Sequence, residues 1–128
     1  MLFRSALDSY RMALRAQPEY AQSWHGLGLA HNDLQQWAEA IDAFDRALAC
    51  QPDMAVACLD RGNALRELDR LDEALAAYDQ ALALQPHYAK AWSNRGVLLK
   101  RLGRLQDALE SYQRAIGLEP GFVDALVN

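Results

Sequence analysis

The chain has 128 residues, of which 52% are hydrophobic and 23% are charged, and its net charge is −4. No apolar run approaches the ~20 residues that a membrane-spanning helix needs. The acidic balance also argues against a surface for nucleic acid, so we expect neither a membrane nor a nucleic acid as a partner.

A fixed spacing of 34 residues organises the chain. The prolines are Pro18, Pro52, Pro86 and Pro120. Small and aromatic residues recur at the same interval: Ala6, Ala40, Ala74 and Ala108; Tyr10, Phe44, Tyr78 and Tyr112; Gly28, Gly62 and Gly96. A period of this length is typical of a stacked array in which each repeat is one supersecondary unit.

Residues 1–20 are predicted to form the second helix of a partial repeat. The segment is amphipathic and carries arginines, as organellar targeting peptides do. The repeat interpretation is favoured because Ala6, Tyr10 and Leu14 match later residues of the period, and because Asp8 is acidic. The segment lacks a secretory apolar core, so we expect a cytoplasmic protein. The excess of Arg (eleven) over Lys (two) favours a bacterial source.

Residues 21–54, 55–88 and 89–122 are predicted to be three full repeats, each with two helices joined by a tight turn. The second helices have apolar residues at steps of three and four, as in Leu71, Ala74, Leu75 and Tyr78, which is one face of a helix. The turns are expected at Gln35-Gln36, Asp69-Arg70 and Gly103-Arg104, and each proline separates two repeats.

The recurring glycines are predicted to let the two helices of a repeat cross closely. We expect Gly28, Gly62 and Gly96 to face the alanines Ala40, Ala74 and Ala108. The aromatic residues of the period are then expected to fill the wider gap further along.

Residues 123–128 are predicted to begin a further first helix. The sequence therefore starts and stops inside a repeat, without the polar-faced capping helix that usually closes such an array. We expect a fragment of a longer array or of a larger protein. We also expect head-to-tail self-association through the two uncapped ends.

Residues that could carry chemistry are few. Cys50 and Cys58 fall at apolar positions, so we expect buried reduced thiols, while a disulfide between them stays open. The three histidines are not at metal-ligand spacing. The sequence shows neither a Ser/His/Asp set nor a glycine-rich phosphate loop. We therefore predict a protein that is not an enzyme, with no cofactor and no metal.

The motif Trp24-x2-Leu27-Gly28, followed by Ala40, Phe44, Ala47 and Pro52, resembles the tetratricopeptide repeat. The resemblance covers nearly the whole chain. It implies an all-α fold, an α-solenoid of antiparallel helix pairs in a right-handed superhelix, with about seven helices plus a C-terminal helical stub. It also implies that the first helix of each pair lines the concave side. Cys58 departs from the Trp position, and Arg61 and Arg95 stand where Leu27 stands, with stems that can lie on apolar surface.

Function is therefore expected in the concave groove, as a protein–protein interaction scaffold that binds an extended peptide or a partner segment. Leu29, Leu59 and Val97 are predicted to form an apolar line along its floor. Asn63, Asn94 and Asn128 are predicted to pair with a peptide backbone, because an amide both donates and accepts hydrogen bonds. The other predicted groove residues are Arg66, Lys90, Lys100 and Arg101.

Charge changes along the array. Residues 21–54 contain one basic and five acidic residues, whereas residues 89–122 contain six basic and three acidic residues. An acidic segment would be drawn to the end that carries Lys90, Lys100 and Arg101.

Three more specific functions follow from the resemblance. Some members of the family clamp the acidic tails of heat-shock chaperones with Lys, Asn and Arg side chains. The matching residues here are His25, Leu29, Asp60, Lys90 and Asn94, of which only Lys90 fits, so we expect no such binding. Asn94, Asn128 and the Leu-Gly-Arg phrase of the third repeat resemble arrays that precede O-linked N-acetylglucosamine transferase domains, which would make this an enzyme arm that guides protein substrates. The remaining alternative is a self-assembling structural array.

Overall fold

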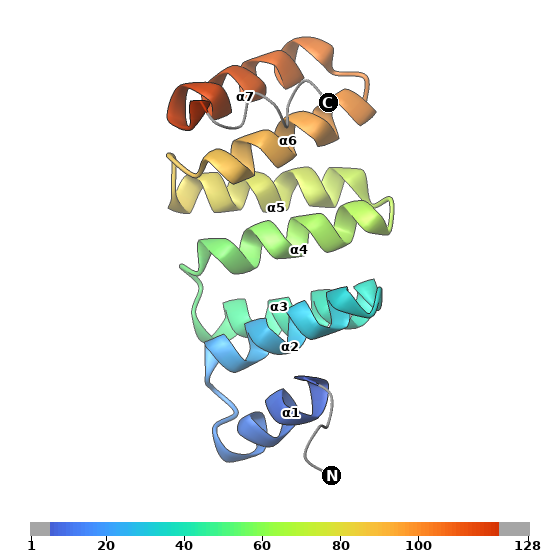
Figure 1. The fold of residues 1–128 in the computed structure, drawn as a ribbon, viewed down its shortest axis with the longest axis vertical. Coiled ribbons are helices and arrows are strands. Elements are labelled where there is room, and N and C mark those ends of the chain that lie inside the picture. The colour runs from blue at the N-terminus through green and yellow to red at the C-terminus, as the bar shows by residue number, and fades with distance from the viewer. Residues whose placement is uncertain (1–5, 121–128) are drawn as a thin grey trace.

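The computed structural model describes residues 6–120, which form seven helices and no strand (Figure 1). This confirms the all-α architecture and the number of helices. The predicted stub at 123–128 lies outside the described residues. The helices are α1 (Ala6–Ala16), α2 (Ala21–Asp33), α3 (Trp37–Cys50), α4 (Ala55–Glu67), α5 (Leu71–Leu84), α6 (Ala89–Arg101) and α7 (Leu105–Leu118).

The helices are stacked in chain order along the long axis of the molecule (Figure 1). Each helix packs on the next, and α4 also contacts both α2 and α6. Pro18, Pro52 and Pro86 lie in the links before α2, α4 and α6, where a residue without an N–H and with a fixed φ ends one helix before the next begins. The array is therefore built from contacts between neighbours.

The turn inside each helix pair uses one left-handed residue. These residues are Gln35 (φ 58°), Asp69 (φ 61°) and Gly103 (φ 78°). In all three turns the next N–H bonds back to a carbonyl five residues earlier, at 2.9 Å, which is the closing bond of a Schellman-type helix end. The shared geometry holds each helix pair antiparallel, although only the third turn has a glycine.

The glycines make room for aromatic rings, which were expected to lie further along. At Gly62 the predicted alanine is close as well, because a Cβ placed there would lie 3.3 Å from the Ala74 backbone oxygen. A Cβ placed on Gly28 would lie 2.3 Å from the Phe44 ring, and one on Gly62 would lie 2.6 Å from the Tyr78 ring. Phe44 and Tyr78 are fully buried. The ring of the second helix therefore rests against the backbone of the first, where no side chain fits.

Two arginines join successive repeats. The Arg61 Nε donates to Asp45, and the Arg95 Nε donates to Asp79 at 2.7 Å, in both cases across sixteen residues. Arg95 also donates to the buried hydroxyl of Ser111 at 2.7 Å. These two arginines stand at the position of the buried Leu27 of the first repeat. Their guanidinium groups form polar contacts between repeats and are not simply solvated.

The two cysteines lie in different environments. Cys58 is fully buried, and burial raises the pKa of its thiol, although the nearby Arg61 charge opposes the shift. The expectation that Cys50 is buried is wrong, because this residue ends α3 next to the link and is exposed. Both thiols are free.

Candidate functional site

The first helices of the three pairs, α2, α4 and α6, carry the predicted groove residues. We call their shared surface the groove face. Two polar contacts tie these helices together directly: His25 Nε2 to Asp60 Oδ2 at 2.7 Å, and Asn94 Nδ2 to Asn63 Oδ1 at 3.1 Å. A third contact links Arg101 of α6 to Asp69 in the turn after α4, at 3.0 Å. Polar contacts therefore join α2 to α4, and α4 and its following turn to α6, along the groove face.

The predicted apolar line is only partly present. Leu29 and Val97 are each 39% exposed, but Leu59 is 1% exposed and belongs to the core cluster that contains Phe44 and Tyr78. The prediction that Leu59 lines the groove is wrong, because its position in the period is that of His25, whose side chain is only 14% exposed, while Asn63 is the residue 34 positions after Leu29. Leu59 lies one helical turn earlier and packs inward. The exposed Val56, at 37%, is the apolar residue that α4 presents instead.

The amides of the groove face bond to each other. Asn63 Oδ1 accepts hydrogen bonds from Asn94 Nδ2 and from the Tyr78 hydroxyl, the latter at 2.5 Å. Burial raises the pKa of Tyr78 to about 12, so its hydroxyl is a neutral donor in ordinary conditions. The buried Tyr78 therefore fixes the position of the Asn63 side chain. Asn128, the third predicted amide, lies outside the described residues.

The contact of His25 with Asp60 was not anticipated. Both side chains are largely buried, with 14% and 15% of their surface exposed, and the His25 ring lies 5.7 Å from the Phe44 ring. Partners on successive first helices are 31 to 35 residues apart in the sequence. A search for complementary side chains at this spacing would have found the pair.

Positive charge gathers at the α6 end of the groove face. Lys90, Lys100 and Arg101 are exposed, and Arg66 of α4 is half-buried. Arg101 pairs with Asp69, whereas over residues 6–120 no ion pair involves Arg66, Lys90 or Lys100. Three cations of this face are therefore available to an acidic partner.

The described part of the chain offers little basis for other kinds of site. None of its helices is long and apolar enough to cross a membrane. Within the same residues, no group of three or more His, Cys, Asp and Glu side chains could hold a metal ion.

The sequence matches the family model of the tetratricopeptide repeat over residues 2–55 and 59–121. No match is found among curated proteins. Among solved structures, the chain is 27% identical to MamA, with a TM-score of 0.87 over 93% of this chain and 70% of that one. It shows the same fold as residues 41 to the end of MamA from Desulfovibrio magneticus RS-1, at 20% identity and a TM-score of 0.82 over 90% of this chain and 65% of that one.

A third similar structure contains a ligand. The chain is 27% identical to the first tetratricopeptide domain of Spaghetti (RPAP3), solved with the HSP90 peptide SRMEEVD. The TM-score is 0.80, over 84% of this chain and 88% of that chain.

Proposed function

The chain belongs to the tetratricopeptide repeat family, and from this premise we propose that its groove face binds an extended segment of a protein partner. The observation that carries the proposal is the exposure of Leu29, Val56 and Val97 on one surface of three connected helices. Each of these side chains leaves more than a third of its surface in water, and burying apolar surface favours association by ~25 cal/mol per Å².

The charges indicate which kind of segment fits. Lys90, Lys100 and Arg66 have no acidic partner within residues 6–120, and a carboxylate-bearing peptide would neutralise them. Apolar side chains of the same peptide would then lie on Leu29 and Val97. The proposed ligand is therefore an extended peptide that carries apolar side chains for Leu29 and Val97 and carboxylates for Arg66, Lys90 and Lys100.

The HSP90 peptide of the RPAP3 domain is not the ligand that we propose. At the positions that would clamp an acidic tail, this chain has His25 and Asp60, and the two are bonded to each other at 2.7 Å. The Asp60 carboxylate would repel a second carboxylate, and the His25 ring is already engaged.

Affinity capture from a cell lysate with Val97→Glu tests the groove. Val97 is exposed on α6, so the substitution should not disturb the core, and it puts a carboxylate in place of an apolar side chain that the partner is proposed to contact. Ala83→Glu on α5 is the matched control, because it adds the same charge at an exposed helical position outside the groove face.

We expect the native chain and Ala83→Glu to retain the same partner, and Val97→Glu to lose it while keeping the same helical circular dichroism. Equal capture by both variants would contradict binding in the groove. A partner that resists 0.5 M salt would contradict the acidic segment, because exposed ion pairs are screened at that ionic strength.

Head-to-tail self-association is a second candidate, favoured by the outer side of α7. Leu109 of α7 is 49% exposed, whereas Ile41, at the same position of α3, is 6% exposed under α4. At the other end, Ala6 and Ala13 of α1 are exposed although the matching alanines of later repeats are buried. Each end thus presents a surface that a repeat covers elsewhere in the array.

Sedimentation velocity from 10 µM to 1 mM protein tests self-association. We expect the weight-average sedimentation coefficient to rise with concentration, and Leu109→Glu to abolish the rise. Gln80→Glu, at an exposed position of α5, is the matched control. It should leave the increase of the sedimentation coefficient with concentration intact. A strict monomer at 1 mM would contradict this candidate.

A further inference from the structure

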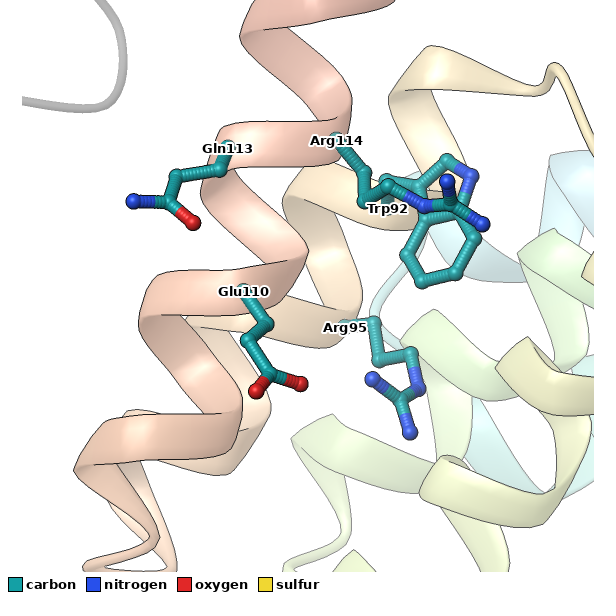
Figure 2. A pocket seen from close by; sticks show the side chains of 5 residues that line it. All are labelled: Trp92, Arg95, Glu110, Gln113 and Arg114. Carbon is teal, nitrogen blue, oxygen red and sulfur yellow. The ribbon is translucent and has the colours of Figure 1, made fainter.

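A second concave region lies between α6 and α7. Two adjoining cavities, of about 530 and 270 Å³, share Trp92, Gln113 and Arg114 as lining residues. The larger also includes Arg95 and Glu110 (Figure 2), and the smaller extends over Pro86, His87, Gly117 and Leu118. We refer to the two together as the α6–α7 cavity. None of the predicted groove residues that the structure describes lines it.

The charge of this region distinguishes the third repeat from the other two. Five lining positions, Arg95 and Glu110 included, carry a net charge of −2 in the first repeat and −1 in the second, but +1 in the third with His87 neutral. The residues concerned are Glu19, Leu27, Asp42, Asp45 and Arg46 in the first repeat, Asp53, Arg61, Ala76, Asp79 and Gln80 in the second, and His87, Arg95, Glu110, Gln113 and Arg114 in the third. The C-terminal end of α7 and the N-terminal end of α6 both line the cavity, so the partial negative charge of one helix end offsets the partial positive charge of the other. The net charge of the cavity therefore comes from its side chains.

Arg114 is positioned but not neutralised. Its guanidinium lies over the Trp92 ring, 5.0 Å from the ring centre, as Figure 2 shows. Arg46 lies over Trp24 at the same distance in the first repeat, but there Asp42 also pairs with it at 3.5 Å. Within residues 6–120, Arg114 forms no ion pair, and the indole fixes a planar group whose N–H donors match a carboxylate.

Gly117 leaves space that nothing in the structure uses. It is the last residue but one of α7, and glycine costs up to roughly 1 kcal/mol relative to alanine in a helix. A Cβ placed on it would meet no atom of residues 6–120 within 4 Å, and the same position holds Ala49 and Ala83 in the earlier repeats. Packing therefore does not explain this glycine. Its effect is to keep the floor of the cavity open beside Leu118.

We propose that the α6–α7 cavity is a second binding site, for a short acidic peptide segment with an adjacent apolar residue. The carboxylate pairs with Arg114, and the apolar side chain lies against Trp92 and Leu118 in the space left at Gly117. This site is independent of the groove face, because the two share no lining residue.

The test uses the full chain and the peptide acetyl-Leu-Glu-Leu-Glu-amide as the probe. The chain has three tryptophans, so three indole N–H signals are followed in nitrogen-15 spectra, and Trp92→Phe identifies the signal of Trp92. This N–H donates to the Pro86 carbonyl at 2.9 Å, at the edge of the cavity. We expect a saturable shift of this signal, and no such shift with acetyl-Leu-Gln-Leu-Gln-amide.

Two variants and their matched controls locate the site. Arg114→Glu and Gly117→Leu should each raise the dissociation constant of the acidic peptide at least tenfold. Gln80→Glu and Ala83→Leu, at the same positions of the second repeat, should leave it unchanged, and so should Val97→Glu on the groove face. Leucine is a better helix former than glycine, so loss of binding in Gly117→Leu cannot come from a weaker helix.

Four results would overturn the proposal. The first is an unshifted Trp92 indole signal at millimolar peptide. The second is an equal loss of affinity in a variant and its control. The third is equal binding of the glutamine peptide. Loss of binding in Val97→Glu alone would place the peptide on the groove face and reject the cavity.

Discussion

Replacing Gly62 by alanine measures how rigidly an aromatic ring is held against the first helix. The new Cβ would lie 2.6 and 2.8 Å from two carbons of the Tyr78 ring, and 3.3 Å from the backbone oxygen of Ala74. Ordinary carbon contacts begin near 3.5 Å, so the ring would have to move by nearly 1 Å. Tyr78 is fully buried and its hydroxyl is bonded to Asn63, which opposes that movement.

Two opposing contributions set the size of the effect. Overpacking a core costs ~1–3 kcal/mol, while replacing a helical glycine by alanine stabilises a helix by roughly 1 kcal/mol. For Gly62→Ala the difference is a net loss of about 0–2 kcal/mol in the free energy of unfolding, and we expect a value near the upper limit because the Tyr78 ring is fully buried. For Gly96→Ala we expect a smaller loss, because the neighbouring Tyr112 ring is partly exposed and can move.

Urea unfolding followed by circular dichroism checks these values, with Gly117→Ala as the control. That glycine is also helical, but a Cβ placed on it has no atom of the described residues within 4 Å, so its replacement should raise the free energy of unfolding by about 0.5–1 kcal/mol. The two substitutions are chemically identical and should have opposite signs. If Gly62→Ala stabilises the protein as Gly117→Ala does, the ring is not rigidly held and the reasoning fails.

Three further predictions concern single side chains. Burial raises the pKa of Tyr78 to about 12, so the folded chain keeps the hydroxyl proton above pH 10, where an unfolded tyrosine loses it. The free energy of unfolding should therefore fall between pH 10 and 12. The fall should be smaller in Tyr78→Phe. An Ellman's-reagent assay of the native protein should detect the exposed Cys50 and not the buried Cys58, with a second thiol appearing in urea; two fast thiols would contradict the burial. Arg95→Ala should lower the free energy of unfolding by about 1–2 kcal/mol, because it leaves the buried Ser111 hydroxyl without its donor. A double-mutant cycle with Ser111→Ala should give a coupling energy of about 1 kcal/mol. Strictly additive effects of the two substitutions would show that this hydrogen bond contributes nothing to stability.

The period predicted the helices better than it predicted which side chains face water. Equal spacing identifies residues that occupy the same place in successive units, so the turns at Gln35, Asp69 and Gly103 followed directly. Leu59 was misplaced because it shares its position in the period with His25, which was expected in the groove and is largely buried in the structure. Cys50 was misplaced because an apolar position near a helix end has fewer neighbours to bury it.

Contacts between repeats were the harder part of the site to predict. The bond of His25 to Asp60 joins different positions of two consecutive periods, so a comparison of equal positions does not reveal it. The same holds for Asn63, whose amide was expected to be free and instead receives two donors. Such pairs depend on the offset between neighbouring first helices, so they are found only when complementary side chains are compared 31 to 35 residues apart and not at equal positions.

The arginine links have a consequence for how an array of this kind changes in length. Asp45 bonds to Arg61 and Asp79 bonds to Arg95, at identical positions of consecutive periods. Deleting residues 55–88 would therefore place Asp45 opposite Arg95, and the joint between units would be restored from existing parts. On the groove face the same deletion would place His25 beside Asn94 in place of Asp60. Gain or loss of one repeat thus keeps the arginine–aspartate contacts between neighbouring repeats and, in the same step, changes which residues meet on the groove face.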